Sequence, residues 1–195
     1  MQPTAAIDLD DVTVDFVPGL LDSYFTEFGE TITVGADGTW GEAMVQFLQG
    51  TDRLRAAGYK STWDWLRDRD WLWATFPAID GAIGGVQTLR HMGFFVEAVT
   101  SKPEWARPQV YRWLGKWRVP FDRVTFVVPG QSKLDVSDAA FIVDDKLDTC
   151  REWVRNARNA IWFDRYSHGV FPTNYAGWRA RTWDDVLTIV REEGL

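Results

Sequence analysis

Short apolar runs alternate with longer stretches of helical spacing along most of this sequence. Each run is bounded by charged or turn-forming residues, as is typical of a buried strand. The runs lie at 5–9, 94–99, 124–128, 139–143 and 160–163. Because parallel neighbours need crossover connections, strands that alternate with helices predict an α/β fold with a doubly wound parallel sheet.

Helical spacing is clear between several of these runs. Val110, Trp113, Leu114 and Trp117 recur at i, i+3, i+4 and i+7 behind Pro108, a residue type favoured in the first helical turn. Other helical patterns cover 17–28, 40–48, 80–92 and the neighbourhood of 150–154, and a capping-box pattern opens a last helix after 182. We expect these helices to cover the faces of the sheet.

The stretch 17–76 departs from the alternation of strand and helix. It is helical and aromatic in character, and four tryptophans, Trp63, Trp65, Trp71 and Trp73, fall within eleven of its positions. We therefore predict two parts: an α/β core formed by 1–16 and 77–195, and a small helical cap formed by 17–76 after the first strand.

Composition narrows the class of protein. At 195 residues and 46% hydrophobic the chain can bury one good core, and its formal net charge of −7 argues against a nucleic acid polymer as partner. One cysteine and two histidines provide neither a disulfide framework nor a zinc site. No apolar run approaches the roughly 18 residues of a membrane span, so we expect no membrane partner, and a reducing cytoplasm is the simplest location.

Polar side chains suited to chemistry follow four of the predicted strands. They are Asp8 and Asp10 after the first strand, Thr100 and Ser101 after the second, Lys133 after the third, and Asp144 and Asp145 after the fourth. Ligands of such sheets bind beyond the carboxyl ends of the strands, so these groups are expected to converge. Singly, each could be an ordinary cap, turn or surface residue.

The closely spaced acids indicate a cation. Asp8 and Asp10 lie two apart at a strand end and project to one side. Two unit charges about 4 Å apart repel by roughly 4 kcal/mol at an effective dielectric constant near 20. Mg²⁺ is the natural partner, because it takes oxygen ligands and keeps waters that a substrate phosphate can replace.

In this order, D-L-D-D-V-T, V-T-S, Lys133 and I-V-D-D resemble the four motifs of the haloacid dehalogenase-like (HAD) phosphohydrolase superfamily. Within it the sequence is most similar to the 5'(3')-deoxyribonucleotidases, on the segments D-L-D-D-V-T-V-D-F, F-P-A-I-D-G-A, V-T-S-K-P and F-I-V-D-D-K. One departure is Asp11, where that family often has glycine. The resemblance covers most of the chain but is weak over 17–76.

The resemblance implies a role for each motif residue. Asp8 would be the nucleophile that forms an aspartyl-phosphate, and Asp10 would protonate the departing sugar oxygen and then activate water. Asp8, the Asp10 carbonyl, Asp144 and Asp145 would form the Mg²⁺ site, and which member of the 144–145 pair contacts the ion stays open. Thr100 and Ser101 would bind phosphoryl oxygens, and Lys133 would offset their charge.

The same resemblance suggests a substrate surface. Phe16 would stack on a nucleobase, Trp71 and Trp73 would line the pocket, and Lys146 would lie near the phosphate; core packing is an equal alternative for the two tryptophans.

Together these features predict a Mg²⁺-dependent phosphomonoesterase acting on (deoxy)ribonucleoside monophosphates. The alternatives are a HAD phosphatase for another small phosphate ester, such as a sugar phosphate, and a catalytically silent nucleotide-binding protein. Base preference, sugar, phosphate position and the formation of a homodimer are left open.

Overall fold

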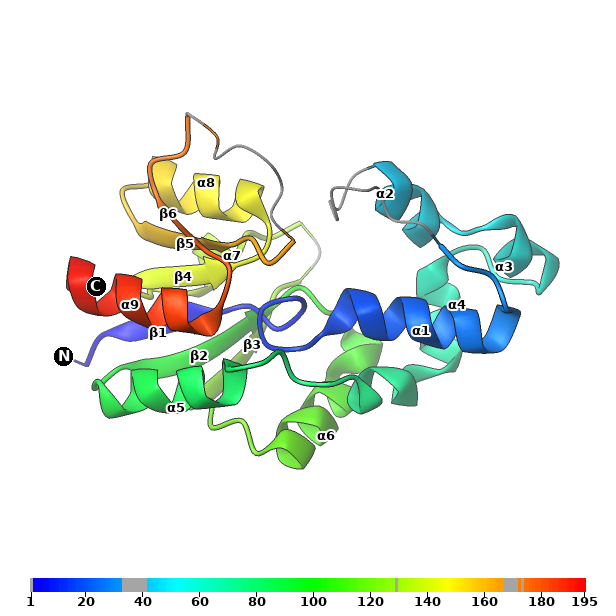
Figure 1. The fold of residues 1–195 in the computed structure, drawn as a ribbon, viewed down its shortest axis with the longest axis horizontal. Coiled ribbons are helices and arrows are strands. Elements are labelled where there is room, and N and C mark those ends of the chain that lie inside the picture. Colours follow the sequence, from blue (N-terminus) through cyan, green and yellow to red (C-terminus); the bar gives the residue numbers. More distant parts are fainter. Residues whose placement is uncertain (1, 33–41, 129, 167–171, 173) are drawn as a thin grey trace.

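A computed structural model describes residues 2–32, 42–128, 130–166, 172 and 174–195 (Figure 1). In these residues six strands form one sheet in the order β3-β2-β1-β4-β5-β6, and every neighbouring pair is parallel. The strands are β1 (Thr4–Ile7), β2 (Phe95–Thr100), β3 (Arg123–Phe126), β4 (Phe141–Asp144), β5 (Asn159–Phe163) and β6 (Trp178–Ala180). The predicted parallel α/β fold is confirmed.

Strand β1 lies at the centre, where the order of strands reverses. Ile7 pairs with Ala98 of β2 on one side and with Val143 of β4 on the other. Ala5, Ala6 and Ile7 are fully buried, as expected for a parallel strand covered on both faces. The central strand therefore ends between the ends of β2 and β4.

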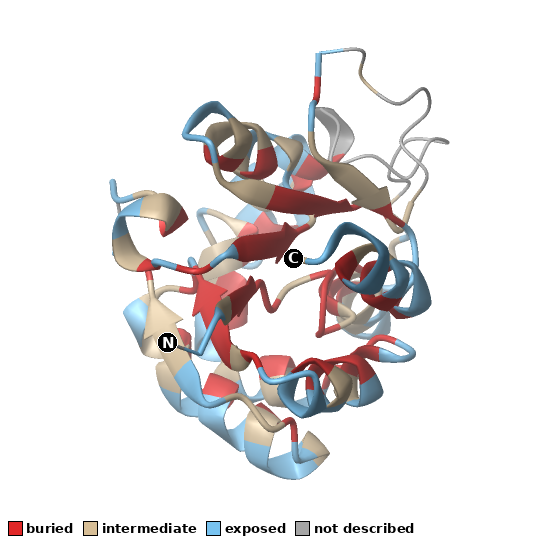
Figure 2. Ribbon diagram, turned by 90° about the vertical axis from the view of Figure 1, so that its left-hand side faces the viewer, coloured by how far each residue is buried: buried red, intermediate tan, exposed pale blue. Residues whose placement is uncertain are grey.

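Helices cover both faces of the sheet, as Figures 1 and 2 show. Helices α5 (Ala82–His91) and α9 (Trp183–Glu193) pack together on the face that buries Ile7, whereas α8 (Leu147–Arg155) packs on the face that buries Ala6. A Cβ atom at Gly85 would lie 2.1 Å from the Trp183 ring, so this position in α5 requires glycine. The remaining core helices are α6 (Arg107–Trp117), α7 (Lys133–Val136) and the short helix η2 (Glu104–Ala106).

The cap expected after the first strand is present. It comprises α1 (Phe16–Phe28), α2 (Glu42–Gln49), α3 (Asp52–Ala56), α4 (Thr62–Asp68) and η1 (Asp70–Thr75). In Figure 1 these helices lie beyond the carboxyl ends of the strands. The last of them, η1, packs against α6 of the core, so cap and core share an extensive contact.

Local sequence signals explain several element ends. Ser61 caps α4 by accepting a hydrogen bond from the Asp64 amide at 3.1 Å, and Thr182 and Asp185 form the predicted capping box of α9. Strand β6 was not predicted, because three residues that include an arginine make no apolar run. Among the described residues, no helix is long and apolar enough to cross a membrane.

Candidate active site

Three carboxylates meet where β1 and β4 end. Asp8 follows β1, Asp144 is the last residue of β4, and Asp145 comes next; ligand oxygens of the three lie within 4.8 Å of one another. Asp144 is fully buried and Asp8 nearly so. The register that pairs Ile7 with Val143 brings these ends together.

Asp145 is the least satisfied member of this cluster. Both of its carboxylate oxygens are buried, and neither has a hydrogen-bond partner among the described residues. Burial, followed by the charges of Asp144 and Asp8, raises the pKa of Asp145 well above its usual value. By contrast, Asp144 accepts hydrogen bonds from the Lys146 amide at 2.8 Å and from Lys133 Nζ at 2.7 Å.

These residues fit a divalent cation. A hard ion such as Mg²⁺ takes carboxylate oxygens as ligands, and it would satisfy the two Asp145 oxygens that accept nothing else. Asp8, Asp144 and Asp145 could all contribute oxygens to such a site, and Asp144 is the member whose oxygens already accept hydrogen bonds.

Lys133 lies against the same cluster at the start of α7. Its Nζ atom is 2.7 Å from an oxygen of Asp8 and 2.7 Å from an oxygen of Asp144, and its side chain is almost completely buried. Burial acts to lower the pKa of Lys133, but Asp144 and Asp8 outweigh it and raise the pKa above the usual value. The two carboxylates therefore favour the charged form of Lys133 beside the carboxylate oxygen of Asp8.

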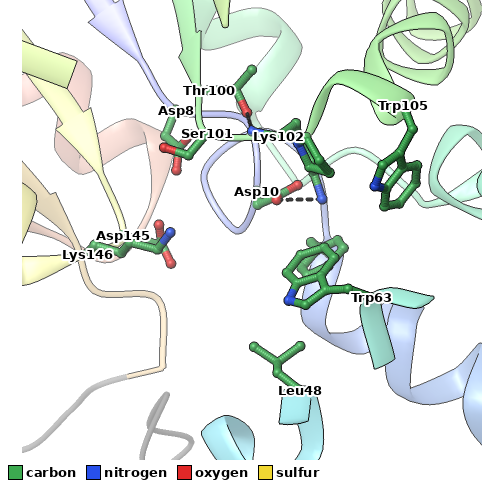
Figure 3. Close-up of a pocket in the computed structure, with 12 residues that line it drawn as sticks. Asp8, Asp10, Leu48, Trp63, Thr100, Ser101, Lys102, Trp105, Asp145 and Lys146 are labelled. Atoms are coloured by element: carbon green, nitrogen blue, oxygen red, sulfur yellow. Dashed lines mark hydrogen bonds and ion pairs between the residues drawn. The ribbon is translucent and has the colours of Figure 1, made fainter. Parts of the chain in front are cut away.

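The Asp10 carboxylate points away from this cluster, towards the cap (Figure 3). One of its oxygens lies 2.7 Å from Lys102 Nζ, and the other accepts a hydrogen bond from Trp73 Nε1 at 3.1 Å. Lys102 is buried, and its ammonium lies 3.8 Å from the centre of the Phe16 ring. Burial lowers the pKa of Lys102, and its partner Asp10 offsets this only in part.

A cavity of about 570 Å³ opens above these groups, between the core and the cap. Its lining consists of Asp8, Asp10, Phe16, Leu48, Trp63, Thr100, Ser101, Lys102, Pro103, Trp105, Asp145 and Lys146. Volumes of roughly 300–1,000 Å³ are typical of small-molecule sites. Asp8 and Asp145 lie on one side of the cavity, the Trp63 and Trp105 rings lie on the other, and Asp10 and Lys102 lie between them (Figure 3).

No family model matches the chain, and no curated protein sequence does either. Solved structures do match over nearly the whole chain. YfnB of Bacillus subtilis, named as a HAD-hydrolase and solved with magnesium bound, has a TM-score of 0.66 at 16% identity and covers 96% of this chain and 98% of its own. This chain has the HAD fold.

Two further structures with the HAD fold are equally extensive matches. The L-2-haloacid dehalogenase RSc1362 has a TM-score of 0.67 at 15% identity, with 97% of this chain and 98% of the other covered. A HAD phosphatase from Thermococcus onnurineus has a TM-score of 0.56 at 18% identity, with 96% and 97% covered. At such identities the likeness shows the fold, and the activity has to be argued from the site.

In this HAD fold the motif residues predicted from the sequence fall at one edge of the sheet. Asp8, Lys133, Asp144 and Asp145 are in contact or within a few ångströms, as described above. Thr100 and Ser101 line the same cavity at the end of β2. The Asp10 side chain lines the cavity as well, but on the cap side of the carboxylate cluster.

The predicted substrate residues are placed less uniformly. Phe16 lines the cavity but is fully buried, because Trp63 stacks on it with the ring centres 6.0 Å apart and Lys102 covers it. Trp73 is fully buried and donates to Asp10, and Trp71 is 54% exposed and outside the cavity lining. Lys146 lines the cavity.

Sequence reasoning missed the residues that line the outer part of the cavity. Leu48 and Trp63 come from the cap, Trp105 comes from η2, and Lys102 follows Ser101 directly. Only Lys102 had a signal, since it lies inside the V-T-S-K-P segment. The placement of the others depends on how the cap packs on the core.

Asp11 shows how the chain accommodates an acid where HAD nucleotidases often have glycine. Its φ angle is 54°, in the left-handed region that aspartate tolerates better than most residues. One carboxylate oxygen accepts hydrogen bonds from the Val17 amide and the Tyr166 hydroxyl, both at 3.1 Å. Burial raises the pKa of Asp11 to about 7, with the charge of Asp10 adding to the effect and the Val17 amide opposing it.

Proposed function

We propose that this protein is a Mg²⁺-dependent phosphomonoesterase that hydrolyses (deoxy)ribonucleoside monophosphates through an aspartyl-phosphate on Asp8. The observation that carries the proposal is the carboxylate cluster itself. Asp145 offers two buried oxygens that accept no hydrogen bond from the described residues, next to Asp8, whose oxygen is held by Lys133.

In the first step Asp8 attacks the phosphorus atom. The Asp8 Oδ1 atom lies against Lys133, which leaves the other carboxylate oxygen for the attack. As the oxygen–phosphorus bond to Asp8 forms, the bond to the sugar oxygen breaks, and Asp10 donates a proton to that departing oxygen.

In the second step Asp10, now a carboxylate, takes a proton from a water molecule that attacks the same phosphorus atom. The bond between Asp8 and phosphorus breaks, which releases inorganic phosphate and restores Asp8. Thr100 and Ser101 donate to phosphoryl oxygens, and Lys133 offsets the charge on Asp8 and on the phosphoryl group. Mg²⁺ bound by Asp8, Asp145 and the Asp10 carbonyl would neutralise charge that builds on the phosphoryl oxygens.

The outer cavity supports a nucleoside as leaving group. Trp63 and Trp105 present indole rings on the side of the cavity away from Asp8 and Asp145, and Leu48 lies near Trp63 (Figure 3). Stacking of a base on an aromatic ring contributes about 1–3 kcal/mol and tolerates different bases. Trp63 and Trp105 therefore take the place that the sequence suggested for Trp71 and Trp73, and Trp63 covers Phe16.

The test is release of inorganic phosphate from a panel of esters, with Mg²⁺ and with EDTA. We expect Mg²⁺-dependent release that is fastest, as kcat/KM, with dTMP, dUMP or related nucleotides, and no release by Asp8→Asn. Faster release from phosphoglycolate or glucose phosphates would keep the mechanism but replace the substrate class. No release from any ester, with nucleotide binding retained, would indicate a catalytically silent protein.

A further inference from the structure

Lys102 occupies an unusual position for a lysine. Its ammonium lies among three aromatic rings, 3.8 Å from the ring centre of Phe16, 5.1 Å from that of Trp73 and 5.3 Å from that of Trp63. The side chain is 2% exposed, and the only carboxylate within ion-pair distance among the described residues is Asp10, at 2.7 Å. Because the ammonium is shielded from solvent, its position depends on the three rings and on that single carboxylate.

The second oxygen of Asp10 is also held. Trp73 Nε1 donates to it at 3.1 Å, and the indole of Trp73 is itself fully buried. The Asp10 carboxylate is thus fixed at both oxygens by groups on its cap side, and it is directed away from Asp8 and Asp145 (Figure 3). The oxygen that leaves phosphorus departs on the side opposite to the attacking Asp8, which is the side where Asp10 is held.

We propose that Lys102 is a positioning residue for Asp10, holding its carboxyl group where the leaving oxygen of the substrate emerges. The inference rests on the proposed function, because it assumes that Asp10 is the general acid. In this proposal the Phe16, Trp63 and Trp73 rings, here called the aromatic box, have a function besides core packing. They restrain the Lys102 ammonium, and Lys102 in turn restrains the Asp10 carboxyl group.

Comparing substrates whose leaving groups differ in their need for a proton distinguishes a misplaced Asp10 from a general structural defect. p-Nitrophenolate departs without a proton, whereas the hydroxyl oxygen of a nucleoside needs one from Asp10. The ratio kcat/KM reports steps up to and including departure of the leaving group. A misplaced Asp10 should therefore lower kcat/KM for a nucleoside monophosphate and leave kcat/KM for p-nitrophenyl phosphate nearly unchanged.

The experiment measures kcat/KM of Lys102→Met on dTMP and on p-nitrophenyl phosphate. General acid–base catalysis contributes about 10²–10⁴-fold, so a loss of about 10- to 100-fold is expected with dTMP and less than about threefold with p-nitrophenyl phosphate. Lys102→Arg should recover only part of the loss, because the planar guanidinium does not fit a cage shaped for an ammonium. Lys116→Met is the matched control: Lys116 also lies over an indole ring, that of Trp117, but outside the cavity, and both esters should be unaffected.

Trp73→Phe provides a second variant if Lys102→Met does not fold. It removes the other donor to Asp10 and keeps an aromatic ring in the box, so it should show the same preference for loss with dTMP. Equal loss on the two esters, or no loss on either, by whichever variant folds would overturn the inference while leaving the phosphatase proposal intact. A wild-type protein that releases phosphate from neither ester would remove the proposed function, and this inference with it.

Discussion

Asp145 presents two buried carboxylate oxygens that accept no hydrogen bond from any described residue, beside Asp144 and Asp8. A buried charge without a partner costs stability, and a cation that binds only the folded state returns it. If Asp145 binds the proposed metal ion, the ion should therefore also stabilise the folded protein.

Asp145→Asn should accordingly separate stability from activity. In metal-free buffer we expect the variant to have a free energy of unfolding about 1–3 kcal/mol higher than the wild type at neutral pH, because burial disfavours the ionised form of Asp145 and asparagine carries no charge. Mg²⁺ at about 100 times its Kd should stabilise the wild type by about 2.7 kcal/mol and the variant by much less. Denaturant unfolding with and without Mg²⁺ measures both effects.

Asp148→Asn is the control for this experiment, since Asp148 is an exposed acid on α8 that lies outside the cavity lining. It should leave the response to Mg²⁺ intact. Equal stabilisation of the wild type and Asp145→Asn by Mg²⁺ would contradict the assignment of Asp145 as a ligand.

Asp11 makes stability depend on pH. Its pKa of about 7 in the folded protein exceeds the unfolded value of 3.8, so between these values the folded state holds a proton that the unfolded state has released. This contribution to stability is therefore present below pH 4 and is lost as the pH rises through 7. Asn at this position keeps both hydrogen-bond donors to Oδ1 satisfied and does not titrate.

In metal-free buffer, Asp11→Asn and the wild type should be similarly stable near pH 4, and the variant should be more stable by about 2–4 kcal/mol at pH 8. Parallel stability curves for the two proteins from pH 4 to pH 8 would show that Asp11 does not titrate in this range.

At the scale of elements, the short helix η2 and helix α4 determine which indole rings line the cavity. Trp105 of η2 lines the cavity, whereas Trp71 of η1 is exposed and does not. Trp105→Ala should therefore raise KM for dTMP about 5- to 150-fold, the equivalent of one stacked base, with a smaller change in kcat. Steady-state kinetics on dTMP measures both constants.

Trp71→Ala is the matched control, because it removes an indole of the same size from outside the cavity. A rise in KM for Trp71→Ala, with none for Trp105→Ala, would contradict the proposed role of Trp105. It would favour the substrate residue Trp71 that the sequence resemblance suggested.

The elements themselves could be predicted where burial leaves a continuous apolar run. β1 and β4 are examples, since each is buried on both faces. β6 could not be predicted, because it is short and polar at its centre.

The sequence also predicted that Asp8, Asp144 and Asp145 lie close together, because parallel strands end at one edge of the sheet. The sequence did not predict the ion pair of Lys102 with Asp10, because this contact depends on long-range packing of the Phe16, Trp63 and Trp73 rings.

At the scale of the whole molecule, the position of β1 at the centre of the sheet organises the site. Asp8 leaves this strand between β2 and β4, which supply Thr100 and Asp144, and the chain then passes directly into the cap through the acidic segment at 10–15. Asp8 and the cap are thus close in the chain (Figure 1). The cavity is lined by Asp8 together with Leu48 and Trp63 of the cap.

The most direct test of this account asks whether Asp8 becomes phosphorylated. A nucleoside monophosphate with a radiolabelled phosphoryl group is mixed with the protein and Mg²⁺, and the reaction is stopped with acid within one turnover. We predict a labelled protein whose label is released by hydroxylamine, lies on the peptide that contains Asp8, and is absent from Asp8→Asn. Turnover without labelled protein, or label that persists in Asp8→Asn, would contradict the proposed mechanism.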